Sequence, residues 1–75
     1  MGKTSIRNNI RRLRFEANEM TQAELAEKVG VTRQTLNAIE AAKYSPTLDL
    51  AFRIAKVFNL PLEEVFQYVG SADLN

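Results

Sequence analysis

The stretch QAELAEKVGVTRQTLNAIEA, residues 22–41, carries the most constrained spacing of small, apolar and turn-forming residues in the chain. Gly30 can adopt the positive φ that ends a helix in a tight turn, and Ala26 is a small residue four positions earlier. Apolar residues recur around this turn at helical spacing. They are Leu25, Ala26, Val29, Val31, Leu36 and Ile39. We therefore predict two helices that cross steeply, as in a helix-turn-helix.

Capping residues indicate where these two helices begin. Thr21 and Glu24 form a Thr-x-x-Glu capping box, in which each side chain bonds the backbone N–H of the other residue. Thr32 is a suitable N-cap for the second helix, which we expect over Arg33 to Ala41. The helix-turn-helix thus spans about residues 22–41.

Three further helices are expected outside this stretch, which makes an all-α fold of five helices in a single domain over residues 1–75. Their expected bounds are Asn8 or Asn9 to Asn18, Leu48 to Phe58 after the N-cap Thr47, and a last helix with Pro61 at its first position. Residues 70–75 are expected to form a flexible tail. The core positions expected in these helices are Ile6, Ile10, Leu13, Ala17, Leu50, Ala51, Ile54, Ala55, Phe58, Leu62, Val65, Phe66 and Val69.

The composition argues against an enzyme. The 75 residues include no Cys and no His, which excludes zinc sites of the usual N/S type, Cys nucleophiles and imidazole triads. Glu63 and Glu64 are neighbours that point about 100° apart on a helix, so they do not face one substrate. We expect a protein without catalytic residues, metal or cofactor. Without an apolar run of about 18–20 residues or a signal-like N-terminus, it is expected to be cytoplasmic.

Charge is unevenly divided along the chain. Residues 1–44 carry eight cations and five anions, a net +3, whereas residues 45–75 carry two cations and four anions, a net −2. The basic half contains the helix-turn-helix. A polyanion is therefore a candidate partner for that half.

The outward face of the second helix of the motif suits a nucleic acid. It carries Arg33, Gln34, Thr35, Asn37 and Ala38, with no acidic residue before position 40. Arg can bond guanine O6 and N7, and Gln and Asn can bond adenine N6 and N7. Long donors and acceptors at the start of a helix are typical of a recognition helix in the major groove.

The stretch from Ile10 to Phe66 resembles the lambda-repressor-like family, also called the Cro/CI or XRE family. The segments that carry the resemblance are MTQAELAEKVGVTRQTLNAIE (20–40) and KYSPTLDLAFRIAKVFNLPLEEVF (43–66). The second segment is similar to the compact subgroup of stand-alone repressors of the cytolysin-operon type. The resemblance implies a five-helix domain that binds operator DNA, usually as a homodimer.

The resemblance also implies roles for individual residues. Gln22, Arg33, Gln34 and Asn37 match base-reading positions, and Thr21, Thr32, Thr35, Lys43 and Tyr44 match phosphate contacts. Both Thr21 and Thr32 are equally suited to capping their helices. Arg14 matches an Arg that pairs with the Glu at position 40, which we favour over a direct phosphate contact.

The cytolysin-type subgroup adds a structural expectation for the termini. Its terminal segments form a small sheet near the dimer interface, and residues 5–7 and 66–68 match them; the alternative is a last helix that runs to Val69. The expected interface residues are Leu60, Leu62, Phe66 and Tyr68. One departure concerns Ala41 and Ala42, which stand where the family commonly has Asn-Gly. Since Ala resists positive φ, the geometry of this loop is open.

We predict a sequence-specific DNA-binding transcriptional regulator, a homodimeric repressor that reads a palindromic operator through the major groove. Two recognition helices would reach half-sites about 34 Å apart. The alternative is an interaction protein, such as an antitoxin-like subunit whose main partner is another protein. An enzyme is the third and weakest hypothesis.

Overall fold

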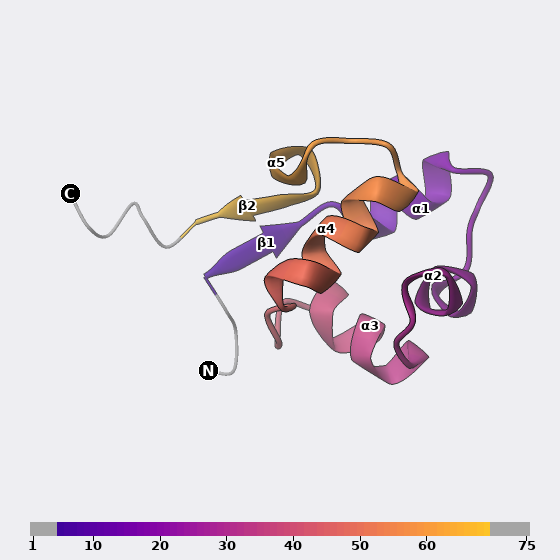
Figure 1. Cartoon of the computed structure of the whole chain (residues 1–75), viewed down its shortest axis with the longest axis horizontal. Coiled ribbons are helices and arrows are strands. Elements are labelled where there is room, and N and C mark those ends of the chain that lie inside the picture. The colour runs from indigo at the N-terminus through magenta and orange to yellow at the C-terminus, as the bar shows by residue number, and fades with distance from the viewer. Residues whose placement is uncertain (1–4, 70–75) are drawn as a thin grey trace.

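The computed structural model describes residues 5–69 of the 75-residue chain, and the tail expected at 70–75 lies outside the described residues. Five helices and two short strands follow one another (Figure 1). They are β1 (Ile6–Asn8), α1 (Ile10–Glu16), α2 (Gln22–Val29), α3 (Arg33–Glu40), α4 (Leu48–Val57), α5 (Leu62–Val65) and β2 (Phe66–Tyr68). This confirms the predicted helical fold with a small sheet near the termini.

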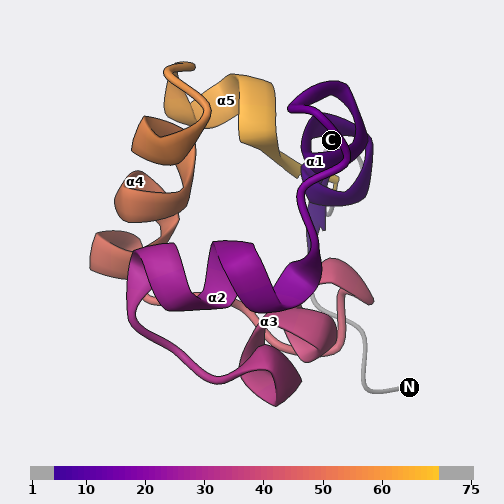
Figure 2. The same cartoon turned by 90° about the vertical axis from the view of Figure 1, so that its right-hand side faces the viewer.

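The α2–turn–α3 unit forms as the sequence predicts. Thr21 and Glu24 make the reciprocal capping box at the start of α2. Gly30 ends α2 at φ 79°, in the left-handed region that residues with a Cβ adopt at a cost. Thr32 then caps α3 by accepting the backbone N–H of Thr35. Figure 2 shows α2 crossing in front of α3, so the turn places α3 on the outside of the bundle.

The core lies between all five helices and β2. Its buried residues are Ile10, Leu13, Leu25, Ala26, Val29, Leu36, Ile39, Leu50, Ala51, Ile54, Ala55, Val65 and Phe66. Every buried side chain of the described residues is hydrophobic. On α4, the Arg53 guanidinium also donates to the Val29 carbonyl at 2.7 Å, which satisfies a free carbonyl at the end of α2. These contacts fix α2 and hence the turn that follows it.

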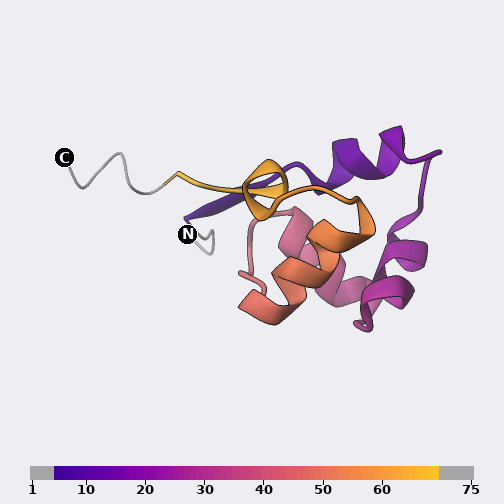
Figure 3. The ribbon, with the colours of Figure 1, turned by 45° about the horizontal axis from the view of Figure 1, so that its top comes forward.

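The two strands form an antiparallel ribbon that projects from the helices at the end far from α2 (Figure 3). Ile6 pairs with Tyr68, and Asn8 with Phe66. The strand near the N-terminus covers residues 6–8 rather than 5–7, so the expected pair of segments is confirmed with a shift of one residue. Ile6 is therefore a strand residue and not part of the apolar stripe of α1.

The bounds of α1 and α5 differ from the sequence expectation. α1 stops at Glu16 rather than near Asn18, because Asn18 and Glu19 both adopt positive φ and turn the chain toward α2. The helix α5 has only four residues, and Pro61 precedes it as the N-cap instead of opening it. Phe66 leaves the helix at φ −123°, where the chain pairs with β1. The helix to Val69, the alternative left open by the sequence, is excluded.

Candidate nucleic-acid interface

The helix α3, which the sequence predicts to be the recognition helix, presents its base-reading candidates to solvent. Arg33, Gln34 and Asn37 are exposed, whereas Leu36 and Ile39 are buried on the opposite face. Within residues 5–69, the side chains of Arg33 and Gln34 make no hydrogen bond or ion pair. The guanidinium of Arg33 and the carboxamide of Gln34 are thus available to an external ligand.

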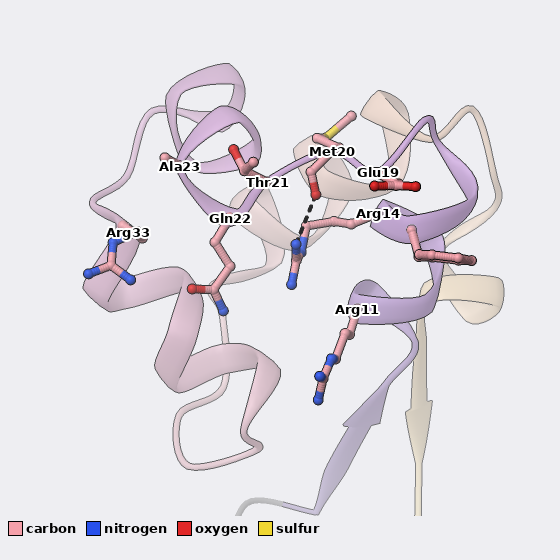
Figure 4. A pocket seen from close by; sticks show the side chains of 9 residues that line it. Arg11, Arg14, Glu19, Met20, Thr21, Gln22, Ala23 and Arg33 are labelled. Carbon is pink, nitrogen blue, oxygen red and sulfur yellow. Dashed lines mark hydrogen bonds between the residues drawn. The ribbon is translucent and has the colours of Figure 1, made fainter.

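Gln22, at the first position of α2, is joined to α3 by hydrogen bonds. Its Nε2 donates to Asn37 Oδ1 and to Glu40 Oε1, each at 3.2 Å. Figure 4 shows the Gln22 side chain lying between Arg33 and Arg14, on the same side of α2. The structure therefore brings the predicted base readers of α2 and α3 onto one surface.

An ion pair behind this surface holds α1 against α3. Arg14 Nε and Nη2 donate to the two carboxylate oxygens of Glu40 at 2.7 and 3.0 Å, and Nη1 donates to the Met20 carbonyl at 2.9 Å. The side chains are only 15% and 8% exposed. Because three of its N–H groups are bonded to Glu40 and Met20, Arg14 has the structural role that the sequence favoured over a phosphate contact.

Two of the three threonines expected at phosphates, Thr21 and Thr32, serve as helix caps, and Thr35 lies within the first turn of α3. Thr21 Oγ1 accepts the Glu24 N–H at 3.0 Å, and Thr32 Oγ1 accepts the Thr35 N–H at 3.1 Å. Thr32 also donates its hydroxyl to Thr35 Oγ1 at 3.0 Å. Capping and phosphate contact are compatible for Thr21 and Thr32, which are exposed at helix N-termini.

The loop after α3 takes the shape that its sequence disfavours. Ala42 adopts φ 61°, the left-handed conformation usually given to Gly. The Lys43 N–H donates to the Ala38 carbonyl at 3.0 Å and the Ala42 N–H to the Ile39 carbonyl at 3.0 Å, as in a Schellman ending. The backbone N–H of Lys43 is thus occupied, while the side chains of Lys43 and Tyr44 remain exposed.

Arg11 is a residue that the sequence analysis did not select. It lies on α1, is exposed, and has no hydrogen-bond or ion-pair partner within residues 5–69. It lines an open hollow together with Arg14, Gln22 and Asn37, and Figure 4 shows its side chain pointing to the same side as those of Gln22 and Arg14. In the sequence, the only signal for Arg11 was its place in the basic run RRLR, residues 11–14.

The interface candidates line two adjoining hollows away from α3. Leu60 and Leu62 line one hollow with Phe52, and Leu62 lines a second one with Phe66 and Tyr68. Tyr68 is 56% exposed, whereas Phe66 is 9% exposed and packs into the core. Leu62 lines both hollows, so the four candidates lie along two neighbouring hollows.

The fold, together with the exposed polar face of α3, defines a helix-turn-helix domain. The second helix of this motif typically enters the major groove of DNA. The chain belongs to the helix-turn-helix family, of the XRE type, whose pattern matches residues 10–65. Membership in this family confirms the class of protein that the sequence predicts. Proteins of this class are not enzymes.

Several HTH-type transcriptional regulators are similar to the chain. A regulator of Methanocaldococcus jannaschii is 53% identical over 51 residues, which are 68% of this chain and 77% of that protein. One of Archaeoglobus fulgidus is 48% identical over 61 residues, 81% and 84% of the two chains. The regulator YgzD of Bacillus subtilis is 44% identical over 61 residues, 81% and 91% of the two chains.

A solved structure supports the fold. The crystal structure of a Bacteroides fragilis protein, described as DNA-binding, superposes with a TM-score of 0.72 and covers 83% of this chain and 98% of that one. The sequences are 24% identical. Within residues 5–69, no helix is long and apolar enough to cross a membrane.

Proposed function

We propose that the protein is a sequence-specific DNA-binding transcriptional regulator whose helix α3 enters the major groove. The observation that carries this proposal is the row of exposed hydrogen-bonding side chains on the solvent face of α3, namely Arg33, Gln34 and Asn37. The left-handed turn at Gly30 and the clamp between Arg14 and Glu40 hold this row in place. A preformed row of this kind suits direct reading of base edges.

The proposed contacts divide into base reading and positioning. Arg33 would bond guanine O6 and N7, and Gln34 the edge of adenine. Phosphates would be held by the N-termini of α2 and α3, at Thr21, Thr32 and Thr35, and by the exposed side chains of Lys43, Tyr44 and Arg11. Phosphate contacts fix register but carry no sequence information.

We propose a homodimer joined through Leu60, Leu62, Phe66 and Tyr68. This apolar surface is rimmed by polar groups and lies away from α3, so a second copy could cover it while both recognition helices stay exposed. A two-fold dimer matches a palindromic operator with half-sites about 34 Å apart. Repression follows by occlusion of the promoter. The protein would act as a single domain in the cytoplasm.

The test is selection of bound duplexes from a random library with the purified protein, followed by a salt titration on the winner. We expect a palindromic consensus and a log–log salt slope of about −5 to −10, as for a dimer with several phosphate contacts on each half-site. Binding that vanishes at physiological salt without any consensus would contradict the proposal. In that case the same surface would have to serve a protein partner.

A further inference from the structure

Phe15 is a large apolar side chain that the fold leaves in solvent. It lies on α1 and is 69% exposed, more than any other large hydrophobic residue among residues 5–69. Its neighbours Ile10 and Leu13 on the same helix are buried. Single exposed apolar residues are common on protein surfaces, so the surroundings of Phe15 decide whether it marks an interaction site.

Two open hollows adjoin Phe15. The first lies between α1 and the start of α2, has a volume of about 570 Å³, and includes the apolar side chains of Phe15, Met20 and Ala23 in its lining. In the second hollow, Phe15 lies beside Asn8 and Asn9. The first hollow falls within the range of about 300–1,000 Å³ that ligand sites occupy. It therefore has room for an apolar side chain of another molecule against Phe15.

The lining of the two hollows is basic. It contains four arginines and two glutamates, a net charge of +2, from Arg11, Arg12, Arg14, Arg33, Glu19 and Glu40. Arg14 and Glu40 neutralise each other in their ion pair. Within the described residues, Arg11 and Arg33 have no ion-pair partner. A molecule that complements this face is therefore negatively charged.

We propose that the face around Phe15 docks an acidic amphipathic helix of another protein. Its apolar side chains would cover Phe15 and Met20, and its carboxylates would face Arg11 and Arg33. Docking of an amphipathic helix in a groove with apolar anchors is a common mode of recognition. Duplex DNA complements only half of this face, because its charged backbone suits the arginines but offers no apolar surface to Phe15.

The docked helix and operator DNA would exclude each other. Gln22 and Arg33, two of the proposed base readers, also line the first hollow, and Figure 4 shows both side chains at this hollow. A helix seated there would cover them and release the operator. This exclusion rests on the proposed DNA-binding function, whereas docking at Phe15 does not.

The experiment selects peptides on the purified full chain. The library displays short helical peptides with acidic residues on one face and random residues on the other. We expect the bound peptides to carry large apolar side chains on the random face. Phe15→Ser should weaken their binding at least tenfold, as for the loss of an interface anchor. Leu48→Ser is the matched control, because Leu48 is 66% exposed on α4 and lines neither hollow; it should bind the peptides like the wild type.

The remaining outcomes separate docking from DNA binding. Enrichment of no peptide, or equal binding to Phe15→Ser and wild type, would overturn the docking surface. An equally large loss of operator affinity in Phe15→Ser would also overturn it, because the face would then belong to the DNA contact. The selected peptides should displace labelled operator, and simultaneous binding of both would contradict the exclusion. Binding of peptides through Phe15 without selection of any operator would support docking and reject the proposed DNA-binding function.

Discussion

Ala42 has a backbone conformation that a side chain disfavours, with φ 61° just after the end of α3. A residue with a Cβ loses roughly 1–2 kcal/mol of stability in the left-handed region. Gly avoids this strain, but it loses roughly 0.5–1 kcal/mol through the greater entropy of the unfolded chain. We expect Ala42→Gly to raise the free energy of unfolding by about 0.5–1 kcal/mol. Thermal unfolding at fixed protein concentration should show the midpoint rising by about 3–6 °C.

The neighbouring alanine provides the control for this prediction. Ala41 has φ −81°, where Gly relieves nothing and only adds freedom to the unfolded chain. Ala41→Gly should therefore lower stability by about 0.5–1 kcal/mol. If both glycines change the midpoint equally, backbone strain at position 42 is not the cause.

Two arginines at the candidate interface should have different effects on DNA binding. Arg33→Ala removes a proposed base contact and should cost about 1–3 kcal/mol on the operator while relaxing the preference at one base pair. Arg11→Ala removes a proposed phosphate contact, so affinity should fall on operator and random duplexes alike. Its salt slope should drop by about 1. Binding titrations at several salt concentrations measure both quantities.

Each arginine serves as the control for the other. A uniform loss in Arg33→Ala, equal on operator and random DNA, would remove it from the base readers. A salt slope unchanged in Arg11→Ala would place Arg11 outside the DNA contact, as an ordinary solvated surface cation.

At the scale of elements, the position of α3 depends on its ion pair with α1. Glu40→Ala would leave the Arg14 guanidinium, 15% exposed, without its carboxylate. A charge stranded in this way is costly. We expect a loss of about 2–3 kcal/mol in stability, measured by urea unfolding. Operator affinity should fall as well, because Glu40 also orients Gln22.

An exposed ion pair of α1 supplies the comparison for Glu40→Ala. Arg12 and Glu16 are more than half exposed and lie 3.7 Å apart. Such surface pairs contribute about 0–1 kcal/mol. Glu16→Ala should therefore change stability by less than about 0.5 kcal/mol. Equal losses of stability in Glu40→Ala and Glu16→Ala would contradict a special role for the Arg14–Glu40 ion pair.

At the scale of the whole molecule, assembly is expected to depend on the surface beside the two-stranded sheet. Tyr68 is 56% exposed at this surface, so Tyr68→Ser should leave the protomer folded and weaken the proposed dimer. Sedimentation equilibrium should show the dissociation constant of the dimer rising by at least tenfold, for a loss of about 1.4 kcal/mol or more. Operator binding should then become less cooperative.

The control for the dimer lies on the other side of the molecule. Phe15 is 69% exposed on α1, outside the interface candidates. Phe15→Ser should leave the dimer unchanged. If Phe15→Ser dissociates the dimer and Tyr68→Ser does not, the proposed interface is on the wrong face.

Local signals in the sequence determined the helix-turn-helix. The capping box at Thr21, the cap at Thr32 and the left-handed Gly30 each depend on interactions within a few residues, and all three are present. The spacing of the apolar residues also determined which face of each helix is buried, because an α-helix has the same period in every context. The pair of Arg14 and Glu40 and the terminal strands were predicted only through resemblance to a family.

Tertiary structure decided what depends on residues distant in the chain. The four-residue length of α5 follows from pairing of residues 66–68 with residues 6–8, a contact that overrides helix propensity. The hydrogen bonds of Gln22 to Asn37 and Glu40 join α2 to α3, and the bonds of Arg14 to Glu40 join α1 to the same helix. Such contacts are set by the packing of whole helices, which no local spacing encodes.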